Sequence, residues 1–99
     1  MRKPKTPKAK KKTDIAALKS SFMRVPHLPV RVARNLLDAG YTELFQLAGR
    51  SPESLFAEIR KVDLAAEESD ILPALRLAVY FSENSDAPDR ALLNLHAWQ

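Results

Sequence analysis

Apolar residues recur at helical spacing along most of the chain, most clearly between Phe22 and Leu37, where it reads FMRVPHLPVRVARNLL. After Pro29, four apolar residues share one face of a helix: Val32, Ala33, Leu36 and Leu37. The other face takes four polar residues: Arg31, Arg34, Asn35 and Asp38. Gly40 is typical of the residue that follows a helix end, so the pattern predicts a short amphipathic helix after Pro29.

A tight turn is predicted before this helix, and another helix before the turn. The turn is the segment 25–28, in which Pro26 and His27 stand between two apolar residues. The preceding helix is expected over about residues 13–24, because a capping Thr or Asp opens it and the residue before a proline leaves the helical region. Its predicted buried face has three apolar positions: Ile15, Leu18 and Phe22. Two helices joined by such a turn make a helix-hairpin-helix motif.

Beyond Gly40 the pattern predicts a short helical turn over residues 42–47, with Leu44 and Phe45 pointing inward. Ser51-Pro52-Glu53 is then a strong helix start, with a capping hydroxyl, a proline at the first position and an acid near the positive end of the dipole. The apolar stripe of this helix has four members: Leu55, Phe56, Ile59 and Val62. Residues 61–69 form a polar, acidic connection.

The most apolar helix is predicted to begin at Ser69 or Asp70 and to end near Asn84, with Pro73 in its first turn, where a missing N–H is tolerated. Its apolar positions are Ile71, Leu72, Leu75, Ala78, Val79 and Phe81. A last short helix is expected from about residue 86, and it carries Leu92, Leu93, Leu95 and Trp98. Trp98 is expected to fold back on the core, and the alternative is that it anchors a partner protein.

In its motifs the chain resembles the small bacterial pathogenicity-locus (mitomycin-resistance-like) helix-hairpin-helix family. The resemblance covers about residues 20–98 and rests on VPHLPVRVA, on AGYTELFQLAGRSPESLFAEI and on ILPALRLAVYF. It implies an all-α fold, a compact double helix-hairpin-helix domain of about five to six short helices, with residues 61–69 as the second hairpin. It also implies DNA as the partner. His27 and Pro29 stand where the family motif has its two glycines.

Charge is distributed unevenly along the chain. Residues 1–12 hold seven basic groups and no acid, residues 13–62 have a net charge of +2, and residues 63–99 have a net charge of −5. We expect residues 1–12 to be a disordered basic arm, because they contain no core-forming residue, and residues 13–99 to form one domain. The arm, which includes Lys10, Lys11 and Lys12, is either an electrostatic contact for nucleic acid or a solubilising tail.

Candidate phosphate contacts surround the first hairpin: Arg24, His27, Arg31 and Arg34. In DNA-binding members of the family the backbone N–H groups of a glycine loop hold a phosphate, whereas Pro29 has no N–H and fixes its φ near −65°. The arginines could replace these donors through their side chains, and the alternative is a purely structural hairpin with solvated arginines. The acids of the second hairpin should repel phosphate, because in the sequence only Lys61 is near them.

No catalytic, cofactor or metal site is predicted. The chain has no cysteine and only two distant histidines, and the acids of residues 63–70 do not have the spacing of a calcium loop. No apolar stretch is long enough to span a membrane and no secretory signal is recognisable, so we expect a cytoplasmic protein. The sequence favours a non-enzymatic, sequence-independent DNA-binding module. The alternative is a protein-protein interaction or scaffold module whose hairpin has lost DNA binding.

Overall fold

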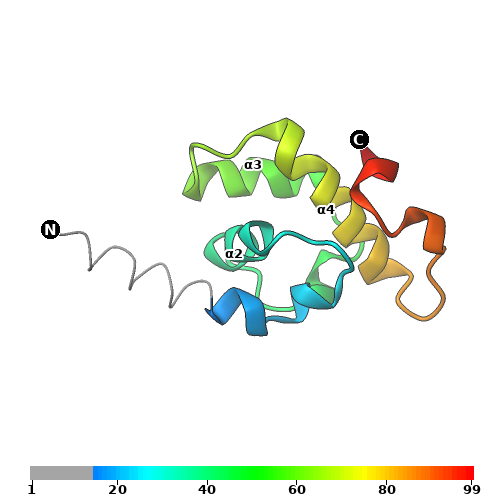
Figure 1. Ribbon diagram of the computed structural model, residues 1–99. Helices are drawn as coiled ribbons and strands as arrows, with labels where there is room; N and C mark the ends of the chain where they lie inside the picture. The colour runs from blue at the N-terminus through cyan, green and yellow to red at the C-terminus, as the bar shows by residue number, and fades with distance from the viewer. Residues whose placement is uncertain (1–14) are drawn as a thin grey trace, which may run out of the picture.

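The computed structural model describes residues 15–99, and all regular structure in that range is helical (Figure 1). After a helical turn over residues 15–19, the order is η1 (Ser21–Arg24), α2 (Val30–Asp38), η2 (Leu44–Leu47), α3 (Pro52–Val62), α4 (Glu68–Glu83), η3 (Arg90–Leu92) and η4 (Leu95–Trp98), where η marks a 3₁₀-helix. The predicted all-α class is therefore confirmed for these residues. The basic arm lies outside the described residues.

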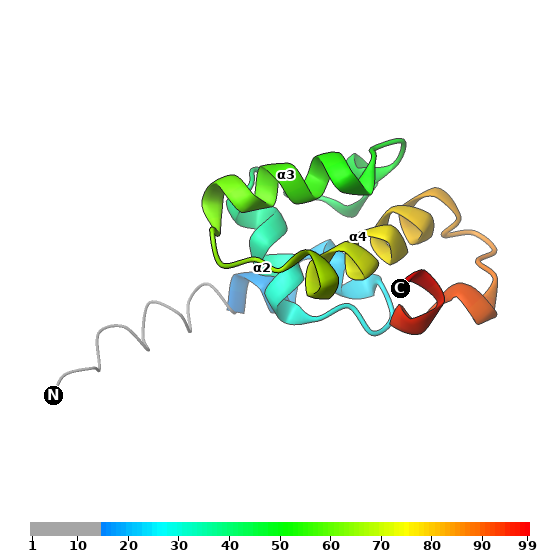
Figure 2. The same cartoon turned by 90° about the horizontal axis from the view of Figure 1, so that it is seen from above.

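Helix α4 lies at the centre of the fold. In two perpendicular views, α2 and α3 lie on one side of α4 and the C-terminal segment lies on the other (Figures 1 and 2). Its buried positions are accordingly almost continuous: Ile71, Leu72, Pro73, Ala74, Leu75, Leu77, Ala78 and Val79. A helix that is apolar nearly all round needs such cover on several sides, and this explains why α4 is the most apolar helix of the chain.

Helix α2 ends at a glycine, as predicted. Gly40 has a φ of +104°, its N–H donates to the carbonyl of Leu37 at 3.0 Å, and the Tyr41 N–H donates to the carbonyl of Leu36 at 2.9 Å. These two bonds form a Schellman motif. The Tyr41 side chain is buried, and its hydroxyl donates to Glu58 Oε1 at 2.6 Å. The motif thus links the end of α2 to α3, and burial together with the Glu58 bond raises the pKa of Tyr41 above its ordinary value.

The buried face that was predicted for the first helix is wrong. Ala17 and Phe22 are buried, whereas Ile15 and Leu18 are about half exposed. The helix is interrupted at Ser20, which is extended and whose hydroxyl donates to the carbonyl of Ala17 at 2.6 Å. The 3₁₀-helix that follows is therefore rotated relative to the helical turn before Ser20. One continuous helical period over residues 13–24 consequently predicts the wrong buried residues.

Asn35, predicted on the solvent face of α2, is buried. Only 2% of its surface is exposed, and its Nδ2 has no hydrogen-bond partner in the described chain. The physical reason is that α2 packs against η1, α3 and α4 at once, so its buried arc is wider than one amphipathic stripe. An unsatisfied buried amide is costly, so this position lowers the stability of the fold.

Phe45 was expected to point inward, and 73% of its surface is exposed instead. A 3₁₀-helix has three residues per turn, so residues three apart share a face. In η2 these residues are Leu44 and Leu47, both buried, and Phe45 is therefore turned outward. The turn is fixed by Gln46 Oε1, which accepts the N–H of Thr42 at 2.7 Å and that of Glu43 at 2.9 Å.

The predicted start of α3 is confirmed, because Ser51 is the N-cap and its Oγ accepts the Ser54 N–H at 3.3 Å. Val62, at the other end, is half exposed rather than part of the buried stripe. Helix α4 ends at Glu83, with Asn84 as its C-cap, close to the predicted end, but it begins at Glu68, slightly before the expected start. Pro73 consequently lies inside the helix, in its second turn and not its first.

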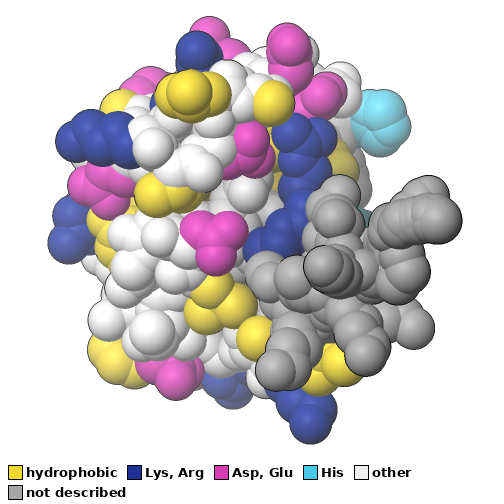
Figure 3. Space-filling model, turned by 90° about the vertical axis from the view of Figure 1, so that its left-hand side faces the viewer, with side chains coloured by type: hydrophobic (Ala, Val, Ile, Leu, Met, Phe, Trp, Pro, Cys, Tyr) yellow, Lys and Arg dark blue, Asp and Glu magenta, His cyan; other side chains and the backbone are white. Residues whose placement is uncertain are grey.

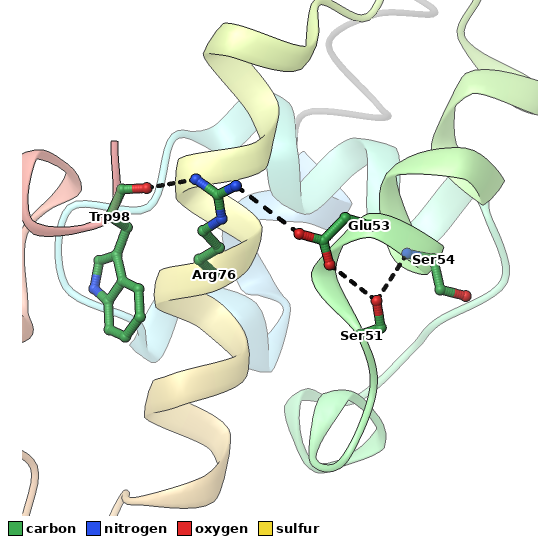
Figure 4. Close-up of polar contacts among 5 residues, drawn as sticks. All are labelled: Ser51, Glu53, Ser54, Arg76 and Trp98. Carbon is green, nitrogen blue, oxygen red and sulfur yellow. Dashed lines mark hydrogen bonds and ion pairs between the residues drawn. The ribbon is translucent and has the colours of Figure 1, made fainter.

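The C-terminal segment forms two 3₁₀-helices instead of one short helix, and Trp98 is partly buried against the core. The indole Nε1 donates to the carbonyl of Leu92 at 2.8 Å, and the ring lies 5.4 Å from that of Tyr80. Arg76 of α4 anchors the segment, since its Nη1 donates to the Trp98 carbonyl at 2.7 Å (Figure 4).

The same guanidinium lies near the start of α3, where its Nη2 is 3.9 Å from Glu53 Oε2 (Figure 4). Hydrogen bonds from the backbone N–H of Glu53 and from the Ser51 hydroxyl hold the pKa of this carboxyl below its ordinary value. Arg76 therefore connects three parts of the chain that are distant in sequence.

Candidate nucleic-acid interface

The first hairpin is a tight turn whose shape depends on His27. The Leu28 N–H donates to the Val25 carbonyl at 3.3 Å, and His27 has a φ of +65°. A proline followed by a residue of positive φ is the pattern of a type II turn, in which the second of the two central residues is usually glycine. Val25 and Leu28 are buried below the turn, and His27 is exposed above it. The turn thus keeps a glycine-type backbone without a glycine.

Pro29 joins this turn to α2 and is the N-cap of the helix. Its φ is −64°, and its carbonyl accepts the N–H groups of Val32 and Ala33 at 3.0 and 3.3 Å. No side chain caps the helix start within the described chain. The helix therefore begins beside the hairpin, but the proline removes one backbone donor at this point, as expected from the sequence.

Arg31 projects from the first turn of α2 and faces the connection between α3 and α4, which was predicted to be the second hairpin. Its Nη2 lies 4.0 Å from Asp63 Oδ2, and the two side chains are 43% and 29% exposed. Asp63 itself is held in place, because its Oδ1 accepts the Ala65 N–H at 3.1 Å and its carbonyl accepts the Ala66 N–H at 3.1 Å. The expectation that the acids of this hairpin lack a basic partner other than Lys61 is therefore wrong for Asp63.

The other candidate residues do not gather around Arg31. Arg31 and Pro29 line a groove whose other wall includes Ser69 and Asp70 of α4, whereas the exposed Arg24 lines a separate groove with Phe45. Arg34 lies half-buried on α2. The predicted contacts Lys10, Lys11 and Lys12 lie outside the described residues.

The charge on the body is mixed. On the face that Figure 3 shows, basic and acidic side chains are interspersed, and hydrophobic side chains form small separate patches. In residues 15–99, no group of three or more metal-ligating side chains is placed to hold an ion, and no helix is long and apolar enough to cross a membrane. The visible part of this face therefore offers local contacts rather than one large basic field.

Two residues of this region were missed in the sequence analysis: Asp63 as the partner of Arg31, and Phe45 as an exposed ring. A signal for Phe45 existed, since a glutamate with a glutamine three residues later is a turn-capping pattern, and it places Leu44 and Leu47 on one face of a 3₁₀-turn. No local signal identifies Asp63, because its contact joins two segments that are distant in the sequence.

Comparison of the chain with protein-family models, curated proteins and solved structures finds no match.

Proposed function

We propose that the protein is a non-enzymatic, cytoplasmic nucleic-acid-binding module without base specificity, of the helix-hairpin-helix family that its sequence resembles. The arm provides long-range attraction to phosphates, and the residues on either side of the first hairpin provide two separate local contacts, one at Arg24 and one at Arg31. Neither contact reads base edges, so DNA is recognised by its backbone.

The conformation of His27 is the observation that carries this proposal. A left-handed backbone costs an ordinary L-residue about 1–2 kcal/mol, although histidine adopts it more readily than most. His27 adopts this conformation, with φ +65°, at a position where the resembling family has glycine. The chain therefore accepts strain to keep the hairpin shape, and strain that is retained in a loop is more typical of a functional site than of a connector.

The distribution of charge supports a division of labour between arm and body. The arm holds seven of the sixteen basic residues, whereas residues 13–99 hold nine basic against twelve acidic residues. A slightly acidic body gains little from non-specific attraction to DNA, so most of the counterion release should come from the arm.

A second candidate function is a protein-interaction or scaffold module whose hairpin no longer binds DNA. The observation that favours it is the ion pair of Arg31 with Asp63. This pair engages the Arg31 guanidinium that a phosphate would otherwise contact. Exposed Leu64, in the loop after α3, would then belong to the contact surface.

Salt-dependent duplex binding separates these two functions. We expect log affinity to fall with log salt with a slope of about −0.9 per phosphate contacted, and removal of residues 1–12 should flatten that slope by several units. In the shortened chain, Arg24→Glu with Arg31→Glu should abolish the remaining binding while circular dichroism stays helical. If the shortened chain does not bind, and the double variant of the full chain binds as well as the natural full chain, only the arm binds DNA. The folded part would then be better explained as a protein-interaction module.

A further inference from the structure

A groove beside the first hairpin has features that the phosphate contacts above do not use. Its walls come from η1, η2 and the end of α4, with six side chains that matter here: Ser21, Arg24, Phe45, Phe81, Ser82 and Ser85. Two hydrogen bonds fix these elements to one another. The Leu44 N–H donates to Ser21 Oγ at 2.7 Å, and the Gly49 N–H donates to Glu83 Oε2 at 2.6 Å. The groove is therefore part of the folded framework.

Phe45 gives this groove an exposed aromatic face. The ring cannot turn inward without expelling Leu44 and Leu47 from the core, because the three residues belong to one 3₁₀-turn. An aromatic ring held outward by a fixed turn offers a large contact area at a low cost in conformational entropy. Such rings are the surfaces on which unpaired bases stack, and every base has a face that fits.

The polar groups of the groove suit a nucleotide. Arg24 supplies a permanent positive charge that a phosphate can accept hydrogen bonds from. The hydroxyl of Ser82 already donates to the Val79 carbonyl, and that of Ser21 accepts from Leu44. Arg24 is therefore the group of this groove that a phosphate would contact.

The exposed ring favours a single strand over a duplex in this groove. Glu43 also lines the groove and offsets part of the charge of Arg24, so a phosphate contact at Arg24 is weak without stacking on the ring. The bases of a duplex are already stacked and paired with one another and cannot lie on a side chain. The principal attraction is then the ring, and only an unpaired base can use it.

We propose that this groove binds an unpaired base of a single-stranded nucleic acid, with the base on Phe45 and its phosphate at Arg24. The inference rests on the proposed function and specifies its substrate as a strand with accessible bases.

Fluorescence anisotropy of the full chain with three labelled probes tests this inference: oligothymidine, an abasic strand of equal length, and a duplex. Phe45→Ala should weaken binding of oligothymidine by about 5- to 150-fold, the range expected for loss of one stacked base. Binding of the abasic strand and of the duplex should not change. The salt dependence for oligothymidine should also stay the same, because stacking releases no counterions.

Two variants serve as controls. Leu64→Ala truncates a side chain that is 81% exposed in the loop after α3, and it should bind oligothymidine like the natural chain. Phe45→Trp keeps a ring and should retain binding, whereas Phe45→Leu keeps apolar area without a ring and should lose it. Helical circular dichroism checks that each variant folds.

The possible failures are distinct. If Phe45→Ala or Phe45→Leu binds oligothymidine as well as the natural chain, or if Phe45→Ala weakens all three probes equally, base stacking in the groove is wrong while nucleic-acid binding stands. A peptide occupant of the groove would give the first of these results. If the natural chain binds none of the probes, the proposed function is wrong, and this inference fails with it.

Discussion

The ion pair between Arg31 and Asp63 should weaken the first hairpin as a phosphate contact, and its removal should strengthen DNA binding. The two charges lie 4.0 Å apart with side chains 43% and 29% exposed. At this distance in water the attraction is about 1 kcal/mol, and exposed pairs measure about 0.2–1 kcal/mol once entropy and salt are included. A phosphate at Arg31 must compete with that energy. Asp63→Asn should therefore raise duplex affinity by up to about fivefold, since 1.4 kcal/mol corresponds to tenfold.

The assay is duplex binding by the chain without residues 1–12, at low and moderate salt. Glu67→Gln is the matched control, because it removes one negative charge from the same loop without breaking the pair. Asp63→Asn should exceed this control at low salt, and the difference should shrink as salt rises. In an Arg31→Ala background the two substitutions should be equivalent. If Asp63→Asn and Glu67→Gln act alike in the natural background, net charge explains the effect and the ion pair does not restrain Arg31.

Three other changes have expected outcomes. Pro29→Gly should lower the free energy of unfolding by about 0.4–1 kcal/mol through the unfolded chain, yet strengthen DNA binding by restoring a donor beside α2; unchanged binding would place the hairpin away from DNA. Asn35→Leu should raise the free energy of unfolding by about 1–3 kcal/mol in urea denaturation, because the unpaired amide is removed; a loss would mean that leucine does not fit. Because the pKa of Tyr41 is raised in the folded state, its contribution to stability is complete below pH 10 and is lost as pH rises through the folded pKa. Tyr41→Phe should therefore be less sensitive to pH in that alkaline range.

Features set by neighbouring residues could be predicted from the sequence. Ser51-Pro52-Glu53 starts α3 because the capping hydroxyl, the proline and the acid act within one turn, and Gly40 ends α2 because the left-handed conformation favours glycine. The run of apolar positions in residues 71–81 likewise predicted the helix that the structure shows as α4. Each of these features depends on groups at most a few residues apart.

Features set by distant contacts could not be predicted in the same way. Asn35 is buried because three other elements cover α2, and a single helical period cannot show how many sides are covered. Asp63, after α3, lies beside Arg31 of α2, and no spacing rule predicts a contact between residues 32 positions apart. The sequence predicted a cluster of arginines around the first hairpin. The structure shows instead Arg31 in an ion pair and Arg24 in a separate groove.

The placement of Trp98 determines what its fluorescence can report. It is the only tryptophan of the chain, and it lies in η4, which has no fully buried residue and is held to α4 by the Arg76 bond and by ring contact with Tyr80. Segments with few buried contacts open locally at lower free energy than the core. Its emission should therefore change when the segment detaches, at a lower denaturant concentration than the loss of helical circular dichroism. Two optical signals that fail to coincide in this protein would thus indicate release of the C-terminal segment and not a folding intermediate of the whole domain.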